Sequence, residues 1–219
     1  GANPDANGNG NPGDDSTPTT VSFSEAPEIG VAKAVIVGPT DNGAGTHPLT
    51  YRIRIVNSGD VPVHGVQITD NLTTTFLAAG GFVVDAVTGS GLTTNPLYDG
   101  ATSFGLLAGT DVLATGASGA VDLRVTVTPG GNLGPYPNNA VGSATSAGGT
   151  ALSDVSTLGP NPDPNGNGNP LDDSAPTPVS FGENPEIGVA KAIVAGPVRN
   201  ANGTYPLTFR IRIENSGDV

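Results

Sequence analysis

The sequence predicts an all-β protein, an antiparallel β-sandwich that repeats along the chain with a period of 158 residues. Apolar and polar residues alternate with a period of two in several short segments. Turn-forming residues separate these segments, since the chain holds 33 Gly and 20 Pro. The first 61 residues return without insertion or deletion as the last 61, and 44 of the 61 paired positions are identical. Such self-similarity is typical of repeat arrays, and it favours a structural protein over an enzyme.

Composition and charge exclude several classes of protein. The chain has no Cys, which excludes a disulfide framework and cysteine-ligated zinc. A net charge of −12 with only eight Lys and Arg makes the chain repel phosphate, so we expect no nucleic-acid partner. No run of 18 apolar residues is present, so we expect no membrane span in this sequence. One period of 158 residues is long enough to bury a hydrophobic core.

The first third of the chain predicts four strands. Residues 1–20 lack apolar periodicity and form a linker or an ion-binding loop, and a short strand follows over 20–23. In the next strand, 29–37, alternate residues share one apolar face that includes Lys33. Residues 49–55 alternate as a half-buried strand does, and after a turn at 57–60 a further strand covers 63–68.

The middle of the unit predicts further strands by the same pattern. The clearest alternation covers 121–127, with Asp122, Arg124 and Thr126 facing outward. Weaker candidates lie at 82–84, 97–98, 104–107, 139–141 and 151–155. No convincing amphipathic helix is present. Roughly nine strands separated by turns predict a sandwich of two antiparallel sheets.

The repeat divides the chain into three parts. A turn with Pro at 25–27 separates residues 1–26, interpreted as the tail of a preceding repeat, from a complete sandwich over 27–184. Residues 185–219 then correspond to the start of the next repeat. We therefore expect two apolar-faced strands, near 189–195 and 207–213, to need a neighbouring unit to cover them.

Two motifs resemble a known family. Tyr-Arg-Ile-Arg-Ile-Val-Asn-Ser-Gly-Asp-Val at 51–61 and Val-Gln-Ile-Thr-Asp-Asn-Leu at 66–72 are similar to the conserved repeat of very large bacterial surface proteins, the eleventh numbered family of domains of unknown function. Residues 107–109, 121–127 and 139–141 fit the later part of its pattern, and 73–103 departs from it. The resemblance covers most of 27–155. It implies an immunoglobulin-like sandwich, strung in tandem on secreted or wall-attached proteins, without enzymatic activity.

Each copy of the repeated segment contains a candidate calcium loop. Asp-x-Asn-x-Asn-Gly occurs at 5–10 and at 163–168, and alternate oxygen side chains can converge on one cation. The bidentate Glu of an EF-hand is replaced by Ser16 and Ser174. The candidate calcium ligands are Asp5, Asn7, Asn9, Asn11, Asp14, Asp15, Asp163, Asn165, Asn167, Asn169, Asp172 and Asp173. The alternative interpretation is a solvated, turn-rich linker.

Lys33 is the only lysine in the first period, and Lys191 is its counterpart. A lysine on an apolar strand face is costly unless it is paired or chemically neutralised. Bacterial surface sandwiches often join a first-strand Lys to a last-strand Asn through an isopeptide bond with a carboxyl group nearby, and by this analogy Asn139 and Asp70 are the candidate partners. An ion pair, or a lysine that extends to the solvent at a sheet edge, is the alternative.

The sequence therefore predicts a structural repeat of an extracellular filament, stalk or giant cell-surface protein, with calcium-stiffened joints. Its expected partners are adjacent copies of the same repeat, arranged head to tail. An adhesive module that binds a glycan or a host surface is the alternative, although the absence of Trp disfavours an aromatic binding platform.

Overall fold

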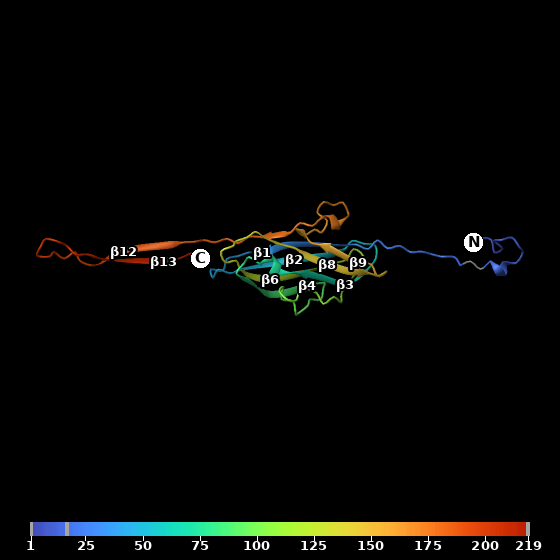
Figure 1. Ribbon diagram of the computed structural model, residues 1–219, viewed down its shortest axis with the longest axis horizontal. Helices are drawn as coiled ribbons and strands as arrows, with labels where there is room; N and C mark the ends of the chain where they lie inside the picture. The colour runs from blue at the N-terminus through green and yellow to red at the C-terminus, as the bar shows by residue number, and fades with distance from the viewer. Residues whose placement is uncertain (1, 16–17, 218–219) are drawn as a thin grey trace.

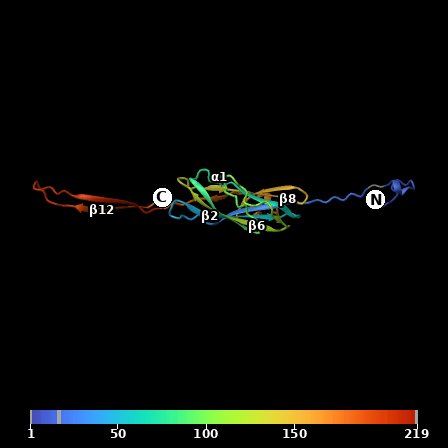
Figure 2. The ribbon, with the colours of Figure 1, turned by 90° about the horizontal axis from the view of Figure 1, so that it is seen from below.

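The computed structural model describes residues 2–15 and 18–217. A β-sandwich occupies the centre, and two extensions leave it at opposite ends (Figure 1). The amino-terminal segment carries a short 3₁₀ helix, η1 (Pro12–Asp14), and the carboxy-terminal extension is a two-stranded hairpin. The view turned by 90° shows the same elongated arrangement (Figure 2).

The first sheet of the sandwich has five strands in the order β10-β1-β2-β6-β4. Only the β10–β1 pair is parallel. The central strand β2 has Leu49, Tyr51, Ile53 and Ile55 fully buried, while the residues between them are less buried, as the alternation predicts. The strands are β1 (Ile29–Val37), β2 (His47–Asn57), β4 (Gly81–Ser90), β6 (Ser118–Thr128) and β10 (Thr157–Leu158).

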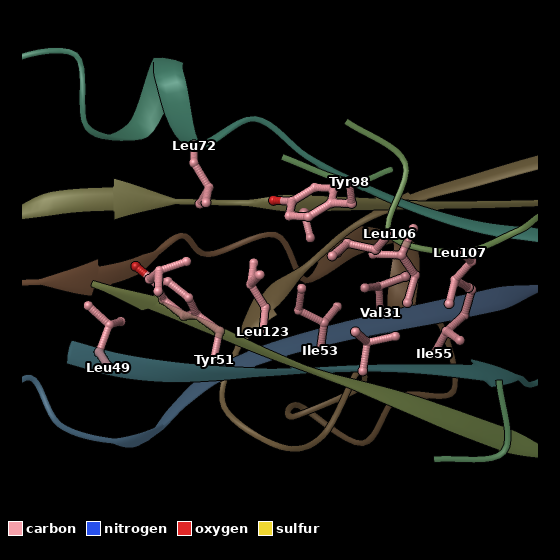
Figure 3. Packing of buried hydrophobic residues seen from close by; sticks show 14 of the residues in the cluster. Val31, Leu49, Tyr51, Ile53, Ile55, Leu72, Tyr98, Leu106, Leu107 and Leu123 are labelled. Carbon is pink, nitrogen blue, oxygen red and sulfur yellow. The ribbon is translucent and has the colours of Figure 1, made fainter. Parts of the chain in front are cut away.

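The second sheet has four antiparallel strands in the order β5-β3-β8-β9. Its inward residues, among them Val63, Val66 and Ile68, join those of the first sheet in one hydrophobic core. Figure 3 shows part of this core, where the inward residues of β2 face Leu72, Tyr98 and Leu106. Such face-to-face packing confirms the expected all-β, immunoglobulin-like antiparallel sandwich. The strands are β3 (Val63–Asp70), β5 (Val112–Leu113), β8 (Ala140–Ser146) and β9 (Ala151–Val155).

Two further strand pairs lie outside these sheets. β7 (Tyr136–Asn138) pairs with β11 (Thr177–Val179) and closes one side of the core. β12 (Ile187–Ala195) pairs with β13 (Thr208–Asn215) in the extended hairpin. A second 3₁₀ helix, η2 (Pro170–Asp172), lies against β1. One short helix, α1 (Leu72–Thr75), is capped at its amino-terminal end by Asn71, whose side chain accepts a hydrogen bond from the Thr74 N–H.

Three expectations from the sequence were wrong in detail. Residues 20–23 form no strand, because this copy of the segment has no sheet beside it to supply hydrogen bonds. Residues 97–98 form no strand either, and 104–107 make only isolated bridges, through Gly105 and Leu107. The helix α1 was not foreseen, because its four residues are too few to show helical periodicity. No helix in the described ranges is long and apolar enough to cross a membrane.

Candidate functional site: a buried lysine, aspartate and asparagine

Lys33 lies at the centre of the sandwich with none of its surface exposed. It belongs to β1, where Ile29, Val31 and Lys33 alternate on the inward face. The Nζ atom lies 4.4 Å from the centre of the Tyr51 ring on β2, a favourable position for a cation beside an aromatic face. An amine in this position needs a polar partner, because charge is strongly disfavoured in an apolar interior.

Asp70 supplies that partner. It is the last residue of β3, and its Oδ2 atom lies 2.5 Å from Lys33 Nζ, with both side chains fully buried. The same oxygen accepts a hydrogen bond of 3.5 Å from Asn138 Nδ2, on β7. The Oδ1 atom of Asp70 is buried and has no hydrogen-bond partner among the described residues. One carboxylate oxygen thus joins an amine and a carboxamide inside the core.

The asparagine in the site is Asn138, and the expectation of Asn139 is corrected. Asn138 is fully buried, whereas Asn139 is exposed between β7 and β8. The reason is the period of two in extended backbone, which points Tyr136, Asn138 and Ala140 inward. This alternation was visible in the sequence, and it would have indicated Asn138. Lys33 and Asp70 lie together as expected.

The carboxamide of Asn138 is held on both sides. The hydroxyl of Thr75, in α1, donates a hydrogen bond of 2.9 Å to Asn138 Oδ1. The carboxyl of Asp70 occupies the Nδ2 side. Because Oδ1 accepts and Nδ2 donates, the two contacts define the orientation of the amide plane. The carbonyl carbon of Asn138 is therefore polarised by a hydroxyl donor at its oxygen.

Burial favours the neutral forms of both ionisable groups. Desolvation lowers the pKa of Lys33, against the opposing effect of the Asp70 charge. Desolvation likewise raises the pKa of Asp70, against the opposing effects of Lys33 and Asn138. Both shifts favour transfer of a proton from the Lys33 ammonium to the Asp70 carboxylate.

The chain closes over this site with residues that sequence analysis did not single out. Thr177, on β11, donates its hydroxyl proton to the backbone carbonyl of Lys33 at 2.8 Å. The Tyr98 hydroxyl donates to the carbonyl of Asp70 at 3.2 Å. Phe181 is buried against the rings of His47, Tyr136 and Phe76. The segment 159–184 thus covers the sandwich of its own unit.

The candidate calcium residues form two similar loops. In the second loop, the side-chain amides of Asn165 and Asn167 donate to Asp172, at 3.1 and 2.8 Å. The carboxylate of Asp163 accepts from the backbone N–H groups of Gly166 and Gly168. Asn169 caps η2 and also contacts Asp172, at 3.4 Å. Asp173 ends η2, where its backbone N–H donates to the carbonyl of Pro170, and its charge acts on Asp154.

The first loop repeats the arrangement. Asn7 and Asn9 donate to Asp14, Asp5 accepts from the Gly10 N–H, and Asn11 caps η1. Asp15 accepts from the Asn7 N–H at 3.3 Å. Ser16 lies outside the described residues. Within the described ranges, no three His, Cys, Asp or Glu side chains converge as a metal site would require. The oxygen donors are of the type that calcium prefers, but in this arrangement the polar side chains within each loop hydrogen-bond to their own loop.

Comparison with known proteins gives only distant likenesses. No family model and no curated protein matches the chain. A major pilin subunit of Bacillus cereus, BcpA, is similar over 89% of this chain and 56% of its own, at 8% identity and a TM-score of 0.41. A GH20 exo β-N-acetylglucosaminidase from Vibrio harveyi is similar over 80% of this chain and 21% of its own, at 13% identity and a TM-score of 0.36. This chain thus spans well under two thirds of either protein.

Proposed function

We propose that this chain is a section of an extracellular structural array, in which each sandwich is covered by its own trailing segment and followed directly by the next sandwich. The observation that carries the proposal is the contrast between Phe23 and Phe181. The two residues are counterparts in the repeated segment, and Phe23 is 94% exposed while Phe181 is 6% exposed. Because the second copy buries this phenylalanine against a sandwich, we infer that the first copy covers a preceding sandwich in the same way.

The hairpin β12–β13 supports the same proposal from the other end. Its residues pair as those of β1 and β2 do, with each partner displaced by 158 positions. In β1 and β2 the counterparts form the core, whereas Ile187, Val189, Ile211 and Ile213 are each more than 60% exposed. An apolar sheet face of this kind is covered in a functional protein. Residues corresponding to 62–184 would complete it as a second sandwich.

The length of such an array is set by the number of units placed end to end. The two extensions leave opposite ends of the sandwich, so successive units would follow one another along one axis (Figure 1). Its role is to span distance and resist proteases, at a cell surface or in a filament. The adhesive alternative and a glycan partner remain predictions from the sequence.

The test extends the chain at its carboxy terminus with the counterparts of residues 62–184. Amide hydrogen exchange of 187–195 and 208–215 is then compared with that of the present chain. We expect these amides to become as protected as those of β1 and β2, because a completed sandwich buries them. A hairpin that exchanges equally fast in both chains would overturn the proposal.

We further propose that calcium binds the two loops and stiffens the joints between units. Asp163, Asn165, Asn167 and Asp172 would supply carboxylate and amide oxygens in the second loop, after the amides turn their oxygens inward. A bound ion stabilises the folded loop by linkage, by about 2.7 kcal/mol at a concentration 100-fold above its dissociation constant.

Limited proteolysis with and without a calcium chelator tests this second proposal. We expect chelation to speed cleavage within 161–174, and Asp172→Asn to remove the difference between the two conditions. A matched control is Asp122→Asn, which lies on β6 away from the loops. Cleavage that does not respond to the chelator would instead favour a solvated linker.

A further inference from the structure

We propose that Lys33 and Asn138 react with each other inside the folded sandwich and become joined by an amide bond between Nζ and Cγ, with release of ammonia. The inference rests on the geometry of the buried site and does not depend on the proposed array. It explains why a lysine, an aspartate and an asparagine share one fully buried point of the core. Without such a reaction the core keeps an amine, a carboxyl and a carboxamide buried at a considerable desolvation cost.

Asp70 contacts both the attacking amine and the leaving amide nitrogen, so the proposed reaction is built on these shared contacts. The amine contacts Asp70 Oδ2 at 2.5 Å, and the leaving nitrogen Asn138 Nδ2 contacts the same oxygen at 3.5 Å. One carboxyl group can therefore take a proton from the attacking amine and deliver one to the departing ammonia. The Thr75 hydroxyl, 2.9 Å from Asn138 Oδ1, lies where negative charge develops on the carbonyl oxygen.

Atoms and charges balance without any added reagent. The ammonium of Lys33 first gives a proton to Asp70, which leaves a neutral amine and a carboxylic acid, the two forms that burial favours. The lone pair of Nζ attacks Cγ of Asn138, and Nζ loses one proton to Asp70 as Nδ2 gains one from it. The Cγ–Nδ2 bond then breaks and ammonia departs. Asp70 ends as the carboxylic acid with which it entered the attack.

The reaction requires a complete unit, because its groups come from four elements: β1, β3, β7 and α1. Lys191, the counterpart of Lys33, lies in the exposed hairpin, with its Nζ 4.0 Å from the centre of the Phe209 ring. We therefore expect one crosslink in the chain, although it contains two lysines.

The mass of the intact, denatured chain tests the proposal. We expect it to fall short of the sequence mass by one ammonia, and we expect proteolytic digestion to yield two peptides joined through Lys33 and Asn138. A chain with the full sequence mass would overturn the proposal. The measurement needs no variant and does not depend on the stability of a mutant.

A second chemistry also releases ammonia and has to be separated from this one. Asn-Gly sequences can cyclise to succinimides, and the chain contains such pairs at 7–8, 9–10, 42–43, 165–166, 167–168 and 202–203. Alkaline hydroxylamine cleaves a succinimide and leaves an ordinary amide intact. A mass deficit that disappears under hydroxylamine, or that maps to an Asn-Gly pair, would contradict the proposed bond.

Matched variants assign the residues. We expect Asn138→Ala and Lys33→Met to retain the ammonia, and Asn139→Ala and Lys191→Met to lose it as the parent chain does. Thr75→Val should slow bond formation about 100-fold, as loss of a donor to a developing oxyanion does. Bond formation in Asn138→Ala, or none in Asn139→Ala while that variant folds, would refute the assignment. If Asn138→Ala fails to fold, the joined peptides of the parent chain still identify the asparagine.

Discussion

The segment 1–23 and the segment 159–181 are two copies of nearly one sequence in two surroundings. In the second copy Val179 is 2% exposed and pairs with β7, while its counterpart Val21 is 71% exposed and belongs to no strand. The residues do not differ at this position, so the difference lies in the sandwich that the second copy contacts. Whether this valine is buried therefore depends on contact with a sandwich and not on the sequence of the segment itself.

The capped loops and the hairpin register, in contrast, recur in both copies. η1 and η2 are each capped by an Asn side chain, and their Asn–Asp hydrogen bonds recur at 2.9 and 2.8 Å. β12 and β13 repeat the register of β1 and β2, including the irregularity after Val35 and Ile193. Short-range hydrogen bonds thus form without a core, whereas strand formation at 177–179 requires one.

The largest expected effect comes from truncating the two phenylalanines. Phe181→Ala should lower the free energy of unfolding by about 3–5 kcal/mol, because it empties a site among three aromatic rings. Phe23→Ala should change it by less than about 0.5 kcal/mol, since the ring is exposed. Denaturant unfolding measures both. Equal effects would mean that the two copies are not in different surroundings in solution.

A smaller loss of stability should follow from adding a methyl group to β1 at Gly30, where the second copy of the segment packs against it. An added Cβ at Gly30 would lie 2.7 Å from Pro170 Cβ and 2.8 Å from Pro162 Cβ, so Gly30→Ala should cost about 1–3 kcal/mol. At the counterpart Gly188 the nearest atom is 3.8 Å away, and Gly188→Ala should be neutral. Thermal unfolding of the two variants compares them. A neutral Gly30→Ala would show that the loop does not pack on β1.

The smallest expected effect is a pH dependence to which the docked copy contributes through Asp173. Burial, with repulsion from Glu28 and Asp173, raises the pKa of Asp154 from 3.8 to about 6. The folded state therefore binds this proton more tightly, and stability falls by about 1–2 kcal/mol as the pH rises from about 4 to about 6. Asp154→Asn should remove that fall, since an Asn oxygen can still accept from the Val31 N–H.

Equivalent substitutions in the two copies provide a control for the pH dependence of stability. Asp173→Asn should lower the pKa of Asp154 and shift the fall in stability to lower pH, because it removes one repulsion. Asp15→Asn, at the corresponding position of the first copy, should leave the dependence unchanged. Denaturant unfolding at pH 4 to 7 distinguishes them, and a shift in both variants would argue against docking of the second copy alone.

Much of the sandwich was predictable, because strands packed on one side must alternate. Strands β1, β2, β3 and β6 and the inward direction of Lys33 follow from that pattern. Residues 97–107 did not follow it, because bends and isolated bridges carry no periodicity. The buried asparagine was misplaced by one residue, a shift that in extended backbone exchanges the inward and outward faces.

The sequence by itself determined the repeat, the strand pairing of each hairpin and the capped loops, since these depend on residues close together along the chain. Only the tertiary structure decided which copy is buried, which phenylalanine enters the core and which asparagine meets Lys33 and Asp70. These contacts join residues from distant parts of the chain, up to 144 positions apart for Thr177 and Lys33. Their formation depends on the packing of both sheets, which local sequence pattern does not specify.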